Sequence, residues 1–330
     1  MALQQQKTIS PFLSFFKSRE FILLILLFFV FVVGKATSPW FLDVYNLFDT
    51  TAIFSEISLV ALSMALVIIA RDIDISVASI IALSSLCMGL AHKLLGFSTI
   101  ELIGVGITVG ALCGMFNGFL IVKFKLPAII VTIGTMSLFR GISAGILGSD
   151  KIANYPTSFM NISQVYFKDV IPYAFIVFLV FVVIFIIVTH YTVFGRYVFA
   201  IGNNPEAARF SGINPDKIRF ILFTLNGIMA GIASVFLTSR LGSTRPDIAL
   251  GLELEIITIV VLGGVSILGG KGTITGVFLA ALVIGFLRLA ITLNNIPGSV
   301  LIVFTGTLLI LSVSLPVILG RLLQKRKQIS

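Results

Sequence analysis

Charged side chains are scarce in this sequence. Asp, Glu, Lys and Arg together make up 11% of the 330 residues, whereas hydrophobic residues make up 58%. An ordinary soluble domain carries about a quarter charged residues, so this chain has too little polar surface to be soluble. Because a helix satisfies its own backbone hydrogen bonds where water is absent, we expect a single helical bundle embedded in lipid.

Histidine and cysteine are equally rare, which argues against metal chemistry. His92 and His190 stand alone, with no carboxylates at metal-ligand spacing around them. Cys87 and Cys113 both fall inside apolar stretches, where a small buried thiol is the usual role. The sequence offers no hydrolytic triad. We therefore predict no catalytic residue, no metal site and no cofactor bound by this chain.

A nucleotide-binding loop is also missing. The run from Gly264 to Thr273 comes nearest to a Walker motif, but Val265 stands where a glycine is required and Gly272 stands where Ser or Thr must follow the lysine. If ATP drives this protein, then ATP and Mg²⁺ bind to another chain. The glycines at 106, 110, 114 and 118 repeat at every fourth residue, and this spacing predicts a helix face for close packing.

Long apolar stretches are abundant. A spanning helix needs roughly 20 mostly apolar residues, and the sequence predicts about ten spans near 21–33, 53–70, 75–92, 98–122, 127–147, 171–190, 218–239, 253–269, 273–291 and 297–318. The net charge of +9 follows the positive-inside rule if both ends of the chain are cytoplasmic. Nucleic-acid binding is therefore not predicted. The outer segments then hold few cations, namely Lys35, Lys93, Lys151, Lys168, Arg240 and Arg245.

Polar residues within spans are expensive in lipid and are therefore candidates for a functional path. The densest group, at Asp72, Asp74 and Ser76, interrupts an apolar stretch. It is either a short cytoplasmic turn that caps the next helix or a broken helix that lines a transport path. The other candidates are Asn117, Thr132, Thr135 and Asn226, for which bonding across helices is the alternative, and Arg140, which can instead snorkel to the interface.

The longest inner loop, 191–217, contains the signals of a short helix. Asn204 is a suitable N-cap, Pro205 suits the first helical position and Gly212 suits a left-handed stop, so we expect a helix from Pro205 to Ser211. Such a stub is not stable alone in water. It docks either on its own bundle or on a partner protein. The candidate docking residues are Asn204, Pro205, Glu206, Ala207, Ala208, Arg209, Ser211 and Gly212.

This loop resembles the coupling helix of the ribose, autoinducer-2 and rhamnose permease family of ABC importers. The resemblance covers nearly the whole chain and rests on the family's Ile-Asp-Leu-Ser-Val-Gly-Ser, Asn-Gly, Leu-Pro, Thr-x-Gly-Thr and Val-Leu-Gly-Gly blocks, which match residues 73–79, 117–118, 126–127, 132–135 and 261–264. Residues 70–74, 136–141 and 239–247 look most like rhamnose permeases. Ribose-type members carry Gly-Gly where this chain has Arg71 and Asp72, and Gly where it has Ala78.

The resemblance implies an all-α fold of two pseudo-symmetric halves, roughly spans two to five and seven to ten. It implies a multi-pass permease of the bacterial inner membrane that imports a sugar, with L-rhamnose expected first and autoinducer 2 or a ribose-like pentose as alternatives. An ion-coupled secondary transporter is the alternative of another class. The domains would be a cytoplasmic segment 1–20, the permease domain 21–320 and a basic cytoplasmic tail 321–330.

The resemblance also implies partners. They are a cytoplasmic ATP-binding subunit, a second permease copy or paralogue, a periplasmic sugar-binding protein and membrane lipid. The chain itself is expected to be a transport subunit and not an enzyme.

Overall fold

The computed structural model describes residues 19–297, 300, 302–311 and 314, and these residues are mostly helical. Eight of the described helices are long and apolar enough to cross a membrane. They are α2 (Arg19–Thr37), α3 (Val44–Ile69), α4 (Val77–Leu95), α5 (Thr99–Phe124), α6 (Ala128–Leu147), α8 (Tyr173–Tyr191), α11 (Pro215–Leu241) and α13 (Ile274–Leu293). The chain is thus an all-α, multi-pass membrane protein, as predicted.

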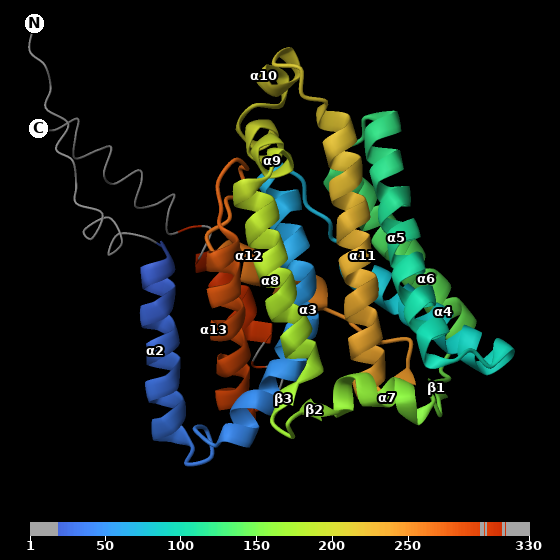
Figure 1. The fold of residues 1–330 in the computed structure, drawn as a ribbon, viewed down its shortest axis with the longest axis vertical. Coiled ribbons are helices and arrows are strands. Elements are labelled where there is room, and N and C mark those ends of the chain that lie inside the picture. Colours follow the sequence, from blue (N-terminus) through green and yellow to red (C-terminus); the bar gives the residue numbers. More distant parts are fainter. Residues whose placement is uncertain (1–18, 298–299, 301, 312–313, 315–330) are drawn as a thin grey trace, which may run out of the picture.

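Short elements cover the two ends of the bundle (Figure 1). We call one end the loop end, because it carries α9 (Val193–Asn203) and α10 (Pro205–Phe210). We call the opposite end the sheet end. It carries the strands β1 (Ile152–Ala153), β2 (Tyr166–Phe167), β3 (Ile171–Pro172) and β4 (Ser243–Thr244), together with helix α7 (Thr157–Gln164). β1 pairs with β4, and β2 pairs with β3, both antiparallel.

The middle of the molecule is built around α3, whose residues from Thr50 onward are almost all buried, whereas α2 buries few residues. α5 and α11 cross each other through glycines on both sides. A Cβ atom added to Gly110 would clash with the carbonyl oxygen of Gly227, and one added to Gly114 would clash with that of Phe223. The predicted glycine repeat is therefore a packing face, because small residues let two helix backbones approach closely.

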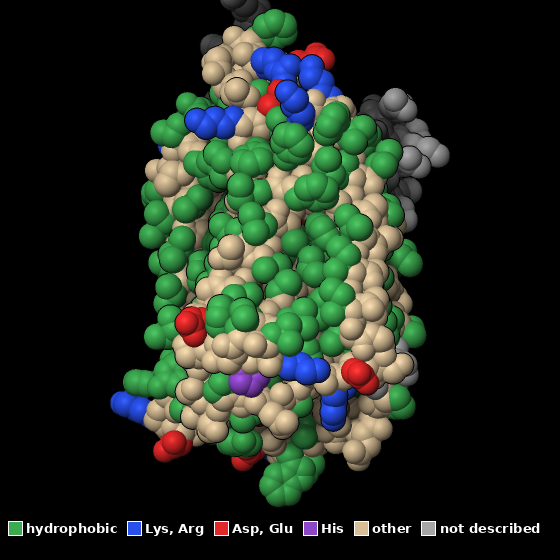
Figure 2. All heavy atoms as spheres, turned by 90° about the vertical axis from the view of Figure 1, so that its right-hand side faces the viewer, with side chains coloured by type: hydrophobic (Ala, Val, Ile, Leu, Met, Phe, Trp, Pro, Cys, Tyr) green, Lys and Arg blue, Asp and Glu red, His purple; other side chains and the backbone are tan. Residues whose placement is uncertain are grey.

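The lateral surface of the bundle suits lipid. Figure 2 shows one side, where hydrophobic side chains cover the middle and Lys, Arg, Asp and Glu side chains gather near the two ends. Phe116, Phe119, Ile130 and Ile133 of α5 and α6 are among the large hydrophobic residues exposed along the bundle. An apolar belt between two charged rims is what a bilayer requires.

The predicted span at 253–269 is wrong in its length. Helix α12 covers only Leu252–Leu262, and the chain then turns at Gly264, whose φ is 90°. Turns continue to Thr273, which caps α13. The sequence remains apolar beyond Leu262, but the helix ends there. Gly264 adopts a left-handed backbone conformation, which residues with a side chain disfavour.

Some predictions lie partly outside the described residues. Of the expected span 297–318, the structure describes a short apolar helix, Ile302–Leu311. Residues 1–18 and the tail 321–330 are not among the described residues, whereas Arg19 and Glu20 already belong to α2. Arg19 donates to the Gly264 carbonyl oxygen at 3.0 Å, and Thr273 donates to Glu20 at 2.8 Å, so the start of α2 lies at the loop end.

The sheet end is closed by polar contacts that the sequence did not predict. The hydroxyl oxygens of Tyr155 and Thr244 lie 2.8 Å apart, and those of Thr244 and Ser85 lie 2.6 Å apart. Burial raises the pKa of Tyr155 to about 12. A tyrosine hydroxyl group is protonated at neutral pH in any case, and this shift keeps that of Tyr155 protonated into the alkaline range as well.

The glycine contact between α5 and α11 gives a direct test of the fold. Gly110→Ala should lower the free energy of unfolding by about 1–3 kcal/mol or more, because the added methyl group overpacks a backbone contact. The measurement is thermal unfolding of the purified protein in detergent. Gly104→Ala, on the same helix where no atom lies within 4 Å of an added Cβ, is the matched control. Equal melting temperatures for the two variants would contradict the packing role.

Candidate functional site

The connection between α3 and α4 is the most polar segment inside the bundle. α3 ends at Ile69, Arg71 takes a left-handed φ of 72°, and the chain runs without helix until α4 begins at Val77. Asp74 and Ser76 have 0% of their surface exposed. Residues 70–76, which we call the interrupted segment, therefore turn back into the interior of the bundle and do not form an exposed surface turn. Whether they line a transport path stays a prediction.

The Asp74 carboxylate is the centre of a buried hydrogen-bond network. Its Oδ1 accepts from the Ser76 backbone N–H at 3.0 Å and from the Ser76 hydroxyl at 2.6 Å. Its Oδ2 accepts from the Asn226 amide of α11 at 3.0 Å. Asn226 in turn accepts from Ser63 of α3 at 2.7 Å, and Asn117 of α5 donates to Ser76 at 2.8 Å. The network joins three spanning helices to the interrupted segment.

The remaining path candidates lie on α6. Thr132 is buried and donates to the Ile73 carbonyl oxygen at 3.3 Å, while Thr135 donates to the Thr132 carbonyl oxygen on its own helix. Arg140 does not reach away from the bundle. Its guanidinium donates to the Ile248 carbonyl oxygen at 2.6 Å and, at 3.4 Å, to those of Pro246 and Ala78. Arg140 thus ties α6 to the segment between β4 and α12.

These contacts show a cross-helix role for Asn117, Asn226, Thr132 and Arg140. Within this single chain the Asp74 network is sealed from solvent, since all of its members are buried. One acceptor, Asn117 Oδ1, is buried without a hydrogen-bond partner. A role of these residues in a transport path stays a prediction.

At the loop end, three distant segments meet in backbone contact. Arg71 donates from Nε to the Gly202 carbonyl oxygen at 2.7 Å and from Nη2 to that of Asn203 at 2.8 Å, so it caps the end of α9. The Gly270 N–H donates to the Ile69 carbonyl oxygen at 2.9 Å. A Cβ added to Gly202 would clash with that same carbonyl group. The interrupted segment, α9 and the 263–273 turn are therefore held together.

An ion pair fastens the same segment to α11. Arg219 donates from Nε and Nη2 to the two carboxylate oxygens of Asp72, at 2.6 and 2.7 Å. Such a bidentate pair fixes geometry as well as charge. Asp72 was predicted as a path residue, and the structure shows it bound to Arg219 at the loop end.

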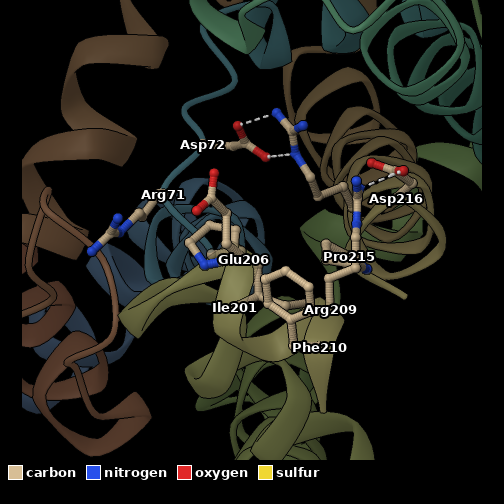
Figure 3. Close-up of a pocket in the computed structure, with 11 residues that line it drawn as sticks. Arg71, Asp72, Ile201, Glu206, Arg209, Phe210, Pro215 and Asp216 are labelled. Carbon is tan, nitrogen blue, oxygen red and sulfur yellow. Dashed lines mark hydrogen bonds and ion pairs between the residues drawn. The ribbon is translucent and has the colours of Figure 1, made fainter. Parts of the chain in front are cut away.

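Between α10 and the interrupted segment lies a cavity of about 590 Å³ (Figure 3). Arg209 and Asp216 form an ion pair at 2.9 Å on one side of it. The Glu206 side chain points from α10 toward Asp72. The cavity leaves α10 connected to the bundle mainly through α9 and the start of α11.

The predicted short helix is confirmed as α10, Pro205–Phe210, one residue shorter than expected. Its role in coupling to an ATP-binding subunit stays a prediction. Asn204 caps it by accepting from the N–H groups of Glu206 and Ala207, and Ser211 and Gly212 follow its end, with Gly212 at a φ of 84°. Ala208 faces the bundle and is buried, whereas Ala207 is exposed. Phe210, not among the predicted docking residues, is 92% exposed. Figure 1 shows α10 beyond the ends of the spanning helices.

Two ion pairs of the bundle were not predicted from the sequence. Glu56 of α3 accepts from Arg240 of α11 at 2.8 Å, and Glu255 of α12 accepts from Arg288 of α13 at 2.7 Å. Glu56, Glu255 and Arg288 within predicted spans were the available signal, whereas Arg240 was predicted to lie in an outer segment. Within the described part of the chain, no group of three or more His, Cys, Asp or Glu side chains could hold a metal ion.

Comparison with known proteins adds two findings. Residues 46–313 match the family described as "Branched-chain amino acid transport system / permease component". The chain is 33% identical over 315 residues to the autoinducer 2 import system permease protein LsrD of Enterobacter sp. (strain 638), covering 94% of each chain. It is 34% identical over 302 residues to the protein of that name from Salmonella paratyphi A, covering 90% of each. No solved structure matches the chain.

The Asp74 network generates a prediction that separates charge from hydrogen bonding. In Asp74→Asn, an amide group faces the Asn226 amide, so one buried hydrogen bond is lost and the free energy of unfolding should fall by about 1–3 kcal/mol. The double variant Asp74→Asn with Asn226→Asp exchanges donor and acceptor and should recover most of this loss. Thermal unfolding in detergent measures both variants. No recovery in the double variant would show that the charge at position 74 itself is required.

Proposed function

Because the chain belongs to the family described as branched-chain amino acid transport system / permease component, we propose that it is the membrane-spanning subunit of an ATP-driven importer for a small sugar-like solute. As a member of that family it is a transport subunit and not itself an enzyme. The eight long apolar helices fit this role. ATP hydrolysis belongs to a separate cytoplasmic chain in this proposal.

We propose autoinducer 2 as the imported solute. The observation that carries this proposal is the match over 90% or more of both chains to permeases whose names specify autoinducer 2 import. The sequence had favoured L-rhamnose on the basis of short blocks, such as residues 70–74. A match over whole chains outweighs such blocks, because neither Asp72 nor Arg71 is free to select a sugar. Asp72 binds Arg219, and Arg71 binds two backbone carbonyl groups.

The loop end would face the cytoplasm and receive the ATP-binding subunit. α10 supports this proposal because it lies outside the bundle and presents the exposed side chain of Phe210. A large aromatic side chain that is almost fully exposed is suited to fill a pocket on a partner. The sheet end would then face the periplasm and a solute-binding protein, and a second permease copy or paralogue would complete the pathway.

The structure offers a route by which movement of α10 would reach the membrane interior. α10 follows directly on α9, whose last carbonyl groups are bound by Arg71. Arg71 precedes Asp72 and Asp74, and these contact α11 through Arg219 and Asn226. A shift of α9 would therefore act on the interrupted segment and on α11 together. Such differential contacts are what allow a partner to change the balance between two conformations.

Substrate choice is tested by uptake. Cells that lack their own autoinducer 2 importer should take up labelled autoinducer 2 when they express this chain with its ATP-binding subunit, second permease and solute-binding protein. Cells without this chain are the control. Uptake of labelled L-rhamnose or D-ribose instead, with none of autoinducer 2, would contradict the proposed solute but not the importer assignment.

Docking of α10 is tested by Phe210→Ala. We expect transport and binding of the ATP-binding subunit to fall at least tenfold, with thermal stability unchanged, because the side chain lies almost wholly outside the permease core. Pull-down of the ATP-binding subunit measures the effect. Phe28→Ala, at an exposed phenylalanine of α2, is the matched control. Normal assembly of the Phe210→Ala variant would reject α10 as the docking element.

A further inference from the structure

A second cavity, lined by apolar residues and by an ion pair, lies away from the Asp74 network. It has a volume of about 460 Å³ and is lined by α12, α13 and the helix Ile302–Leu311. We call it the α12–α13 groove. Its polar side chains come from all three helices and are those of Glu255, Thr258, Arg288, Thr292 and Thr305.

The groove lies at membrane depth and not at the loop end. α13 has 20 residues, which gives a length of roughly 30 Å, about the thickness of the hydrocarbon layer. Arg288 is five positions before its last residue, Leu293, or roughly 8 Å from its end at 1.5 Å per residue. α12 packs beside α13 and places Glu255 next to Arg288. The ion pair therefore lies in the half of the bilayer nearer the sheet end.

Most of the groove lining is apolar, but it also holds a partly exposed ion pair, which is not suited to lipid contact. The Arg288 side chain keeps 22% of its surface exposed and that of Glu255 keeps 10%. Charged groups within a membrane face the bundle interior or a water-filled cavity, because exposure to hydrocarbon is costly. The open side of the groove should therefore meet water or a solute.

The chemistry of the lining selects an uncharged solute. Arg288 donates from one nitrogen to both carboxylate oxygens of Glu255, at 2.8 and 2.7 Å. The two charges compensate each other, so the site does not require a charged ligand. The remaining guanidinium N–H groups can donate and the carboxylate oxygens can accept. Thr258 and Thr305 each donate to a carbonyl oxygen of their own helix, which leaves their hydroxyl oxygens as acceptors. Alternating donors and acceptors match neighbouring hydroxyl groups on a small molecule.

We propose that the α12–α13 groove binds the uncharged, polyhydroxylated solute that this permease imports, with Glu255, Arg288 and Thr258 as its contacts. This inference rests on the proposed import of a sugar-like solute and adds the site. It uses none of the residues predicted from the sequence as path candidates.

Accessibility to water tests the groove without transport. Gly306 lines the groove, and no atom lies within 4 Å of an added Cβ there. In protein whose Cys87 and Cys113 are replaced by Ala, Gly306→Cys should react with a water-soluble thiosulfonate in membranes, and D-ribose or autoinducer 2 at high concentration should slow the reaction at least threefold. Gly104→Cys, equally open but on the apolar flank of α5, should not react. A Gly306→Cys variant that does not react with the thiosulfonate, or whose reaction neither D-ribose nor autoinducer 2 slows, overturns the proposal.

Uptake tests the contacts in the assembled transporter. Thr258→Val should raise the KM for autoinducer 2 uptake by about three- to tenfold, the effect of one lost hydrogen bond, and Thr258→Ser should restore it. Gly306→Phe should abolish uptake by filling the groove, while Gly104→Phe should not. Unchanged uptake in both Thr258→Val and Gly306→Phe would contradict the proposal that the α12–α13 groove binds the solute. If the unaltered protein imports no polyhydroxylated solute, the proposed function fails instead, and the labelling result then decides whether the groove binds one.

Discussion

The interrupted segment between α3 and α4 imposes a constraint on much of the bundle. Backbone that is not helical has unpaired N–H and C=O groups, and lipid offers them no partners. Here the partners come from protein. Asp74 accepts the Ser76 N–H, Thr132 of α6 donates to the Ile73 carbonyl group, and Gly270 donates to that of Ile69. Helices distant in sequence must therefore assemble around this segment before it is stable.

The same segment links the membrane interior to the loop end. Arg71 binds α9 through two carbonyl groups, and Asp72 binds Arg219 at the start of α11. Side chains and backbone thus form one continuous set of contacts from α10 to Asn226. Replacing either glycine where Ile69, Gly202 and Gly270 meet would separate these elements, because there is no space for a Cβ atom between them.

Helices and caps defined by neighbouring residues could be predicted from the sequence, whereas contacts between residues far apart in the sequence could not. The predicted spans 98–122 and 127–147 agree with α5 and α6 within two residues, since apolar length alone defines them. α10 was predicted because Asn204, Pro205 and Gly212 are neighbours along the chain. Asp74 and Asn226 were both recognised as unusual, but they are 152 residues apart, and no local pattern pairs them. Apolar composition also hid the end of α12 at Leu262, which depends on the backbone geometry of Gly264.

The ion pairs within the bundle have a consequence for energetics. Glu56 with Arg240, Asp72 with Arg219, and Glu255 with Arg288 each place opposite charges within 3 Å. Moving a single elementary charge across a membrane changes its energy by about 2.3 kcal/mol per 100 mV. When both partners of a pair move together, these contributions cancel. Rearrangements of the bundle that preserve these pairs would therefore transfer no net charge through them, and the resting membrane voltage would neither drive nor oppose that part of the motion.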